Sequence, residues 1–456
     1  MKQKILVVIF CMLSYSAFSQ SYSKQERVFW LSQIWKDVSD YYYDPDKLVR
    51  INWDSLFVSY IPQVERSTDD DDFYRTLQRF MVHVRDGHTE VVRLGLLDRM
   101  ARQRRLYSLP IEIEYIDGKY YITKWITEYF PNKTLPQEVI AINGVPFETY
   151  LEQNIMPYVS GGTYQWRRKK ALYNFLFAFE PTADIEITVK DLQKTTTSTY
   201  TIPYSNEDFP NANIVALNNP IKRGTNIYRD TDKNGNDYFL FKIARFDNLS
   251  VTQILNQVKS EVADVRYIVL DLRQNSGGDE PLADSLLMGF LNTDTLITYP
   301  SQYRIHNGIK TAQGFGYSEY RDYYENRACA VSQPEIYIKS GSGLPTFTQP
   351  LYILVSENTF SAAETLLFPL ILHYPERAVI FGTPTGGSTG APLVRKMKGE
   401  NYYRICTRGA IVSENFHNEG IIPHVRYDMT IEDYLTGRDT IFDYIADYYI
   451  TKTPKI

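Results

Sequence analysis

Apolar residues recur at helical spacing near the beginning of the chain. The segment "KQERVFWLSQIWKDVSDYYY" (24–43) has apolar side chains every three or four residues, the period of an amphipathic helix. A second segment, "STDDDDFYRTLQRFMVHVRD" (67–86), starts with a Ser/Thr cap and four aspartates. Acidic residues in a first turn complement the helix dipole, so we interpret Asp69–Asp72 in this way rather than as a metal site. The pattern predicts that residues 24–90 are helical.

From about residue 108 the period changes from helical to alternating. "LPIEIEYIDGKYYITKWI" (109–126) alternates around an Asp-Gly pair, and "ADIEITVKDLQKTTTSTYTIPY" (183–204) alternates as well. Both patterns are typical of β-hairpins. Between them, "EVIAINGVPFETYLEQ" (138–153) predicts a strand, an Asn-Gly turn and a helix. We therefore predict a mixed α+β module at 108–205, followed by an Asn- and Pro-rich linker at 206–225.

The rest of the chain alternates short apolar strands with helices. "DTDKNG" resembles the start of a calcium loop, but its twelfth position is Phe241 rather than Glu, which favours a β-hairpin. The strands "RYIVLDL", "PLYILVS" and "RAVIFGT" stand beside helical stretches, including 249–263 and one from 280. This alternation predicts a layered α/β core. Residues 293–349 form a long irregular insertion, which either lines or covers a cleft or packs on the surface.

The first nineteen residues have the composition of an export signal. Two lysines precede an apolar run, and Ala17-Phe18-Ser19 suits cleavage before Gln20. We therefore expect residues 1–19 to be a signal peptide. The mature protein would be periplasmic or secreted, without stable membrane insertion.

The remaining composition argues against a nucleic-acid partner and against a metal site. Acidic residues outnumber basic ones, 54 against 49, and the charges are scattered, which argues against a nucleic-acid partner. Only Cys329 and Cys406 remain after signal removal, and whether they pair is left open. No His/Cys cluster has zinc spacing, so we expect neither a metal nor another cofactor.

Two strand-to-helix junctions carry candidate chemistry. In "LDLRQNSGGDEP" the Gly277–Gly278 turn lets backbone approach a ligand and offers N–H groups to an anion, although a simple sharp turn explains it equally well. In "VSENTFSAAET", Ser361 and Glu364 have the spacing of a capping box. The same placement suits a nucleophile at a helix N-terminus. The N–H groups of Ala362 and the glycine turn would then bind the oxyanion that forms at the substrate carbonyl.

A serine nucleophile needs a base, and "VRDGHTEV" offers His88 in a turn after the acidic-capped helix. An isolated histidine in such a turn more often satisfies the carbonyl groups of a helix C-terminus. The residues alone therefore leave the role of His88 open.

Taken together, the motifs resemble the C-terminal processing (tail-specific) serine peptidases, including their tricorn-core relatives. The segments that match in order are "DGHT", "LPQEVIAINGVPF", "YIVLDLRQNSGG", "ENTFSAAET" and "VIFGTPTGG". The resemblance implies an N-terminal helical region (20–107), a PDZ-like domain (108–205) and a crotonase-like α/β catalytic domain (206–456). It places Ser361 as nucleophile and Gly277, Gly278 and Ala362 at the oxyanion positions.

The chain departs from both branches of that family. One branch uses a lysine in a "T-x-G-K-G" segment, where this chain has Ser388, and Lys396 and Lys398 lie too far along to replace it. The other branch pairs the serine with an early histidine, which His88 fits, and with a late glutamate. His417 stands at that glutamate position. Glu419 is our preferred acid partner, with Glu414 as the alternative.

The PDZ-like segment departs as well. Its entry, "SLPIEIEY", has no glycine in the loop that would bind a C-terminal carboxylate. Strand addition by a peptide remains available to it.

The function expected from these observations is that of an exported serine endopeptidase. It would hydrolyse unfolded proteins or peptides through an acyl-enzyme on Ser361, with His88 as general base. The main alternative is a catalytically inactive family member that binds peptides. A third is a hydrolase of a non-peptide ester, amide or thioester.

Overall fold

The computed structural model describes most of the chain. The described residues are 22–92, 107–130, 134–178, 183–192, 194, 196–205, 213–221, 224–247, 250–304, 310–311, 314–397 and 401–452. The signal-peptide prediction and Lys398 lie outside them. In this part of the chain no helix is both long and apolar enough to cross a membrane.

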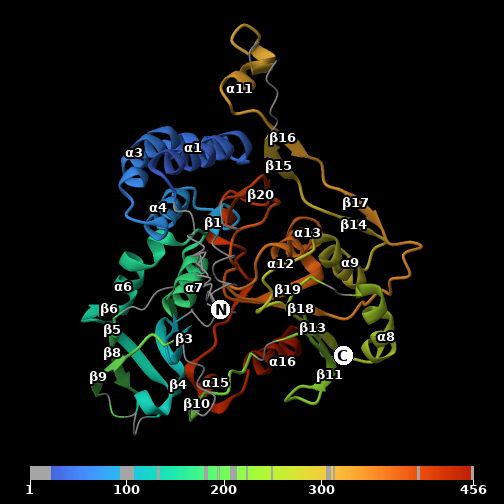
Figure 1. Ribbon diagram of the computed structural model, residues 1–456. Coiled ribbons are helices and arrows are strands. Elements are labelled where there is room, and N and C mark those ends of the chain that lie inside the picture. The colour runs from blue at the N-terminus through green and yellow to red at the C-terminus, as the bar shows by residue number, and fades with distance from the viewer. Residues whose placement is uncertain are drawn as a thin grey trace, which may run out of the picture.

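Four helices open the described chain: α1 (Lys24–Tyr41), α2 (Pro45–Arg50), α3 (Trp53–Arg66) and α4 (Asp70–Val82) (Figure 1). Ser23 and Glu26 form a capping box at α1, and Asp69, rather than the preceding Ser/Thr pair, caps α4. The predicted helical region therefore ends at Val82, and the chain continues through a turn into the strand β1 (Glu90–Val92).

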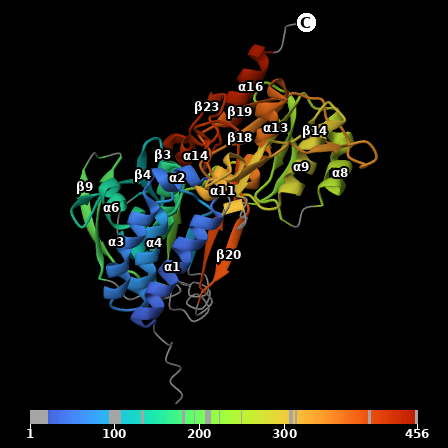
Figure 2. The ribbon, with the colours of Figure 1, turned by 90° about the horizontal axis from the view of Figure 1, so that it is seen from above.

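A hairpin from far along the chain packs against these helices. It consists of β20 (Pro392–Lys396) and β21 (Tyr402–Cys406), and β21 pairs with β1. Tyr403 and Ile405 share one apolar core with the helices. Figure 2 shows β20 extending beside the N-terminal helices. This contact fixes the turn between α4 and β1 against the C-terminal half of the protein.

The next region is an antiparallel sheet with two main helices. Its strands run in the order β10-β4-β5-β8-β9, with β3 on β4 and β6 on β5. Both predicted hairpins, β3–β4 and β8–β9, are confirmed, whereas β10 forms inside the predicted linker. That this module is PDZ-like stays a prediction. The elements are β2 (Tyr107–Ser108), β3 (Ile111–Ile116), β4 (Lys119–Ile126), η1 (Thr127–Tyr129), β5 (Gln137–Ile142), β6 (Val145–Pro146), α6 (Phe147–Asn154), η2 (Met156–Tyr158), α7 (Tyr164–Phe175), β7 (Phe177–Ala178), β8 (Ile185–Asp191), β9 (Thr197–Ile202) and β10 (Ile214–Ala216).

The C-terminal half contains a six-stranded sheet in the order β11-β12-β13-β18-β19-β23. The hairpin β11–β12 is antiparallel and the other neighbours are parallel, so the predicted hairpin and layered α/β core are confirmed. The strands are β11 (Asn226–Thr231), β12 (Asp237–Lys242), β13 (Tyr267–Asp271), β18 (Leu351–Val355), β19 (Ala378–Gly382) and β23 (Val425–Arg426).

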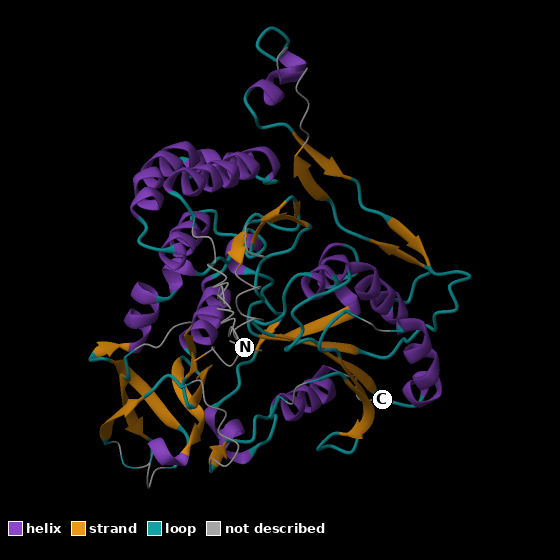
Figure 3. Cartoon of the chain, in the orientation of Figure 1, coloured by secondary structure: helices purple, strands orange, loops and turns teal. Residues whose placement is uncertain are grey.

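Helices cover both faces of this sheet (Figure 3). Because side chains alternate along a strand, Leu270 and Ile353 join one apolar core and Val269 and Leu354 join another. On the first face lie α8 (Val251–Ala263), α9 (Glu280–Phe290), α12 (Ala362–Thr365) and α13 (Leu367–Leu372); α16 (Ile441–Lys452) covers the second. The short elements η4 (Pro375–Arg377), α14 (Phe416–Glu419) and α15 (Ile431–Thr436) complete this half.

The insertion at 293–349 is more regular than predicted. It contains β14 (Thr295–Ile297), β15 (Ser301–Arg304), η3 (Ser318–Tyr320), α11 (Arg321–Tyr324), β16 (Cys329–Ser332) and β17 (Ile336–Ile338). These strands form two antiparallel ladders, β14–β17 and β16–β15–β22, the last strand being β22 (Arg408–Ala410). The prediction of an irregular segment was wrong, because short strands paired across some forty residues leave little local pattern.

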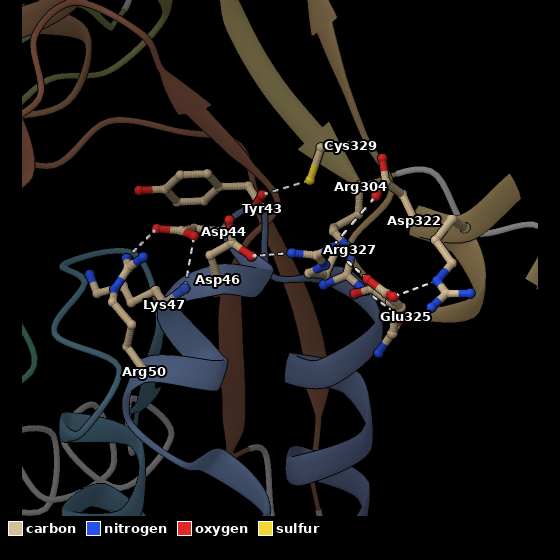
Figure 4. Close-up of polar contacts among 12 residues, drawn as sticks. Tyr43, Asp44, Asp46, Lys47, Arg50, Arg304, Asp322, Glu325, Arg327 and Cys329 are labelled. Carbon is tan, nitrogen blue, oxygen red and sulfur yellow. Dashed lines mark hydrogen bonds and ion pairs between the residues drawn. The ribbon is translucent and has the colours of Figure 1, made fainter. Parts of the chain in front are cut away.

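The insertion contacts the N-terminal helices at its base (Figure 4). The Cys329 thiol donates to the Tyr43 carbonyl at 3.3 Å, and Arg327 lies 3.9 Å from the Asp46 carboxylate. Cys329 and Cys406 are both free thiols, which answers the question of their pairing in this conformation.

Candidate active site

Ser361 occupies a strained turn between strand β18 and helix α12. Its backbone has φ 56° and ψ −123°, a region that residues other than glycine rarely adopt and that occurs preferentially at functional sites. Its N–H points to a Glu364 carboxylate oxygen at 3.2 Å, and the Glu364 N–H donates to the Ser361 carbonyl at 2.8 Å. Ser361 therefore begins the helix, as the capping spacing predicted, and its strained backbone also aims the hydroxyl.

His88 lies in the turn between α4 and β1, where its backbone is held by Asp86. The Asp86 carboxylate accepts the His88 N–H at 2.7 Å, and both residues are buried. The imidazole stacks on Phe360 with centroids 4.9 Å apart, and Phe360 stacks in turn on Trp166 of α7 at 4.0 Å. Aromatic rings from two distant segments thereby fix the plane of the imidazole.

The two ring nitrogens of His88 face two different serines. Nε2 lies 3.2 Å from the Ser361 hydroxyl, and Nδ1 lies 3.0 Å from the Ser388 hydroxyl. Burial lowers the pKa of His88 to about 4, and the Asp86 carboxylate opposes this shift. The imidazole is therefore neutral at pH 7 and able to accept a proton.

The predicted acid partner is not beside the histidine. The side chains of Glu419 and Glu414 are exposed, and Nδ1 of His88 faces Ser388 instead. The prediction that Glu419 orients the base is therefore wrong in this conformation, because α14 directs the Glu419 side chain to solvent. His417, at the position of the family glutamate, has both ring nitrogens buried without a hydrogen-bond partner among the described residues.

The glycine turn after β13 lies directly against the serine. Gly277 has φ +98°, and a Cβ built there would be 2.7 Å from the Ser361 Cβ and 3.0 Å from the Ala362 nitrogen. The Gly277 N–H donates to the Asn275 side chain at 2.8 Å. Within the described structure, the N–H groups of Gly278 and Ala362 donate no hydrogen bond. Of the three predicted oxyanion donors, these two are available to a ligand.

Glu364 is a site residue whose spacing from Ser361 predicts only a helix cap. Its carboxylate is fully buried and accepts four bonds, from the Thr385 hydroxyl (2.5 Å) and from the N–H groups of Gly387 (2.8 Å), Ser388 (3.1 Å) and Ser361 (3.2 Å). Burial raises the pKa of Glu364 to about 7, and these bonds oppose the rise. The available signal was the segment that matches "T-x-G-K-G" of the family, because its lysine position, here Ser388, belongs to the catalytic site of one branch.

The loop bonded to Glu364 is also held from the other side by the mixed α+β region. The Thr163 hydroxyl at the start of α7 donates to the Gly386 carbonyl at 2.9 Å, and the Gln165 side chain donates to the Thr385 carbonyl at 3.1 Å. The loop at 385–388 therefore connects α7, the serine turn and the histidine turn.

A cavity of about 210 Å³ opens on the same strand-to-helix turn that carries the serine. It lies where β18 and β19 end, facing β3 and α7, and its lining includes Glu114, Lys169, Ser356, Glu357 and Gly382. Ligands of open α/β sheets bind at such carboxyl ends of parallel strands. Neither Ser361 nor His88 lines this cavity, so it is a neighbour of the nucleophile and not the place where the scissile bond would lie.

Comparison with known proteins identifies the family. The model for peptidase family S41 matches residues 239–427, and that for the tricorn protease C1 domain matches residues 23–81. No curated protein matches the chain significantly.

Solved structures share the fold. Mature CPAF, and mature CPAF complexed with lactacystin, both have a TM-score of 0.69; they are 15% and 14% identical and cover 95% and 94% of this chain, and 99% of their own. A putative peptidase from Parabacteroides merdae ATCC 43184 has a TM-score of 0.53 and 14% identity, covering 95% of this chain and 98% of its own. The strained serine, the adjoining histidine and the family match agree, and the chain belongs to peptidase family S41, a family of serine peptidases.

Proposed function

We propose that this protein is an exported serine endopeptidase that cleaves unfolded proteins or peptides through an acyl-enzyme on Ser361. The observation that carries the proposal is the 3.2 Å contact between the Ser361 hydroxyl and Nε2 of a buried, neutral His88. A serine is a poor nucleophile until a base removes its proton. The export signal at 1–19 and the division at 20–107, 108–205 and 206–456 belong to this proposal.

The proposed chemistry uses groups of this chain alone. As the Ser361 oxygen attacks the scissile carbonyl, Nε2 of His88 takes the hydroxyl proton. The N–H groups of Ala362 and Gly278 face the oxyanion that forms, and one such donor is typically worth about 10²–10³ in rate. His88 then gives its proton to the leaving amine. Water, deprotonated by the same nitrogen, hydrolyses the acyl-enzyme.

The rival proposal is a peptide-binding protein without activity. The observation that favours it is the exposed Glu419, which leaves Nδ1 of His88 without a carboxylate partner. Loss of a triad acid can cost about 10⁴ in rate, enough to leave binding without measurable turnover.

Hydrolysis of fluorescein-labelled denatured casein by the mature protein separates these functions. The peptidase proposal predicts turnover that is lost in Ser361→Ala and in His88→Ala but kept in Ser413→Ala, which alters a serine away from the site. Casein that binds to the folded wild-type protein without being cleaved would support the rival instead.

A further inference from the structure

The histidine of this site is supported by a hydroxyl rather than by a carboxylate. Serine peptidases of the triad type hold Nδ1 of the base with an acid, which fixes the tautomer and ring orientation. Here the hydrogen-bond partner of Nδ1 within the described structure is the Ser388 hydroxyl, at 3.0 Å. Ser388 is fully buried, so water does not compete for this contact.

Every polar group of Ser388 is bonded to the site. Its hydroxyl oxygen accepts the Gly87 N–H at 3.2 Å, next to the base. Its carbonyl accepts the Ser361 N–H at 3.2 Å, and its own N–H donates to Glu364 at 3.1 Å. One residue therefore contacts the histidine turn, the serine turn and the buried acid.

The Glu364 carboxylate reaches Nδ1 of the histidine through this loop. It binds Thr385, Gly387 and Ser388 on one side and the Ser361 N–H on the other. A buried carboxyl group that is bonded to several neighbours orders them strongly, because leaving a buried polar atom without its hydrogen bond is costly. The loop position thus depends on Glu364, and the His88 contact depends on the loop position.

We infer that Ser388 is the positioning residue of the base and that Glu364 supports the base indirectly, by holding Ser388 against Nδ1. This inference rests on the proposed function and replaces Glu419 in it. In serine peptidases of the triad type, a carboxylate bonded directly to the histidine gives this support. Here Ser388 and Glu364 give it together.

The inference specifies the protonation of the imidazole. A hydroxyl that accepts from Gly87 can still either accept from Nδ1 of His88 or donate to it. A general base at His88 requires the first arrangement, in which Nδ1 carries the proton. The lone pair of Nε2 then faces Ser361, and only the Nε2 proton moves during acylation. The opposite tautomer, with the Ser388 hydroxyl donating to Nδ1, would place a proton on Nε2 and leave Ser361 without a base.

Kinetics of three variants of the mature protein test the inference. Ser388→Ala is expected to slow fluorophosphonate labelling of Ser361 and to lower kcat on labelled casein by roughly 10- to 100-fold with KM little changed, as for loss of one buried hydrogen bond to a reacting group. Ser388→Thr keeps the hydroxyl and is expected to recover most of that loss. Thr389→Val is the matched control, since the neighbouring Thr389 hydroxyl is buried without a partner in the described structure.

Nitrogen-15 NMR of His88 gives a readout that does not need turnover. The inference predicts a proton on Nδ1 in the wild-type protein and a changed His88 signal in Ser388→Ala, with the Thr389→Val spectrum unchanged. A proton on Nε2, or labelling by Ser388→Ala at the wild-type rate, would overturn the inference. A folded wild-type protein that never labels would refute the proposed function, and the tautomer would still decide the role of Ser388.

Discussion

The contact between the glycine turn and the nucleophile predicts a severe effect of a single methyl group. In Gly277→Ala the new Cβ would lie 2.7 Å from the Ser361 Cβ, 2.8 Å from the Phe360 carbonyl oxygen and 3.0 Å from the Ala362 nitrogen. Two of these three atoms are backbone, so no side-chain rotation relieves the clash. The serine turn itself has to move.

The magnitude follows from two separate terms. The positive φ of Gly277 costs any other residue about 1–2 kcal/mol, and forcing a methyl into a packed site adds about 1–3 kcal/mol. We therefore expect a loss of about 2–5 kcal/mol in the free energy of unfolding. A displacement of Ser361 by about 1 Å can also cost about 10²-fold in rate.

Gly235→Ala separates the two terms. Gly235 has φ +77°, and a Cβ added there would meet nothing within 4 Å, so this variant tests backbone strain without a clash. The free energy of urea unfolding and the fluorophosphonate labelling rate should both fall much further in Gly277→Ala than in Gly235→Ala. Equal losses of stability together with unchanged labelling would refute the reasoning that the glycine turn and the nucleophile are in contact.

Three further predictions follow from the hydrogen bonds and pKa shifts of the site. Burial raises the pKa of Glu364 to about 7 from 4.5, so its contribution to the free energy of unfolding is complete below about pH 4.5 and is lost as the pH rises through 7. The free energy of unfolding in urea should therefore fall between about pH 4.5 and 8 in the wild-type protein but not in Glu364→Gln, and an equal pH slope in both would contradict this prediction. Because the pKa of His88 is about 4, the labelling rate of Glu364→Gln, which lacks the carboxyl that titrates near pH 7, should stay constant from about pH 8 to 5 and halve near pH 4. A midpoint near 6.5 would show that the ring is not buried. Thr163→Val removes both the helix cap of α7 and the bond to Gly386 and should lower stability by about 1–2 kcal/mol, with a thermal melt as the check and an unchanged melting temperature as the contrary result.

Local patterns predicted much of the fold. The hairpins β3–β4, β8–β9 and β11–β12 were foreseeable because alternation and a short turn lie within one stretch of sequence. The parallel sheet followed from apolar strands beside helices. The ladder of β14 and β17 was missed because Thr295 pairs with Ile338, and neither strand carries a buried face long enough to show a period.

The site was predictable only in part. His88 and Ser361 are 273 residues apart, and their pairing came from the family resemblance rather than from spacing. Glu419 was chosen by its position in a motif, but one exposed turn of helix decides where a side chain points, and no motif records that. Glu364 was explained locally as a cap, so its bonds to a loop more than twenty residues later gave no signal.

The most direct test of the account is the intact mass of the mature protein after incubation with a fluorophosphonate, followed by peptide mapping of the adduct. One adduct is expected, on Ser361, in the wild-type protein and in Ser413→Ala, and none in His88→Ala. An adduct on Ser361 that forms equally fast without His88, or a folded wild-type protein that forms none, would contradict the claim that this serine is activated by this histidine.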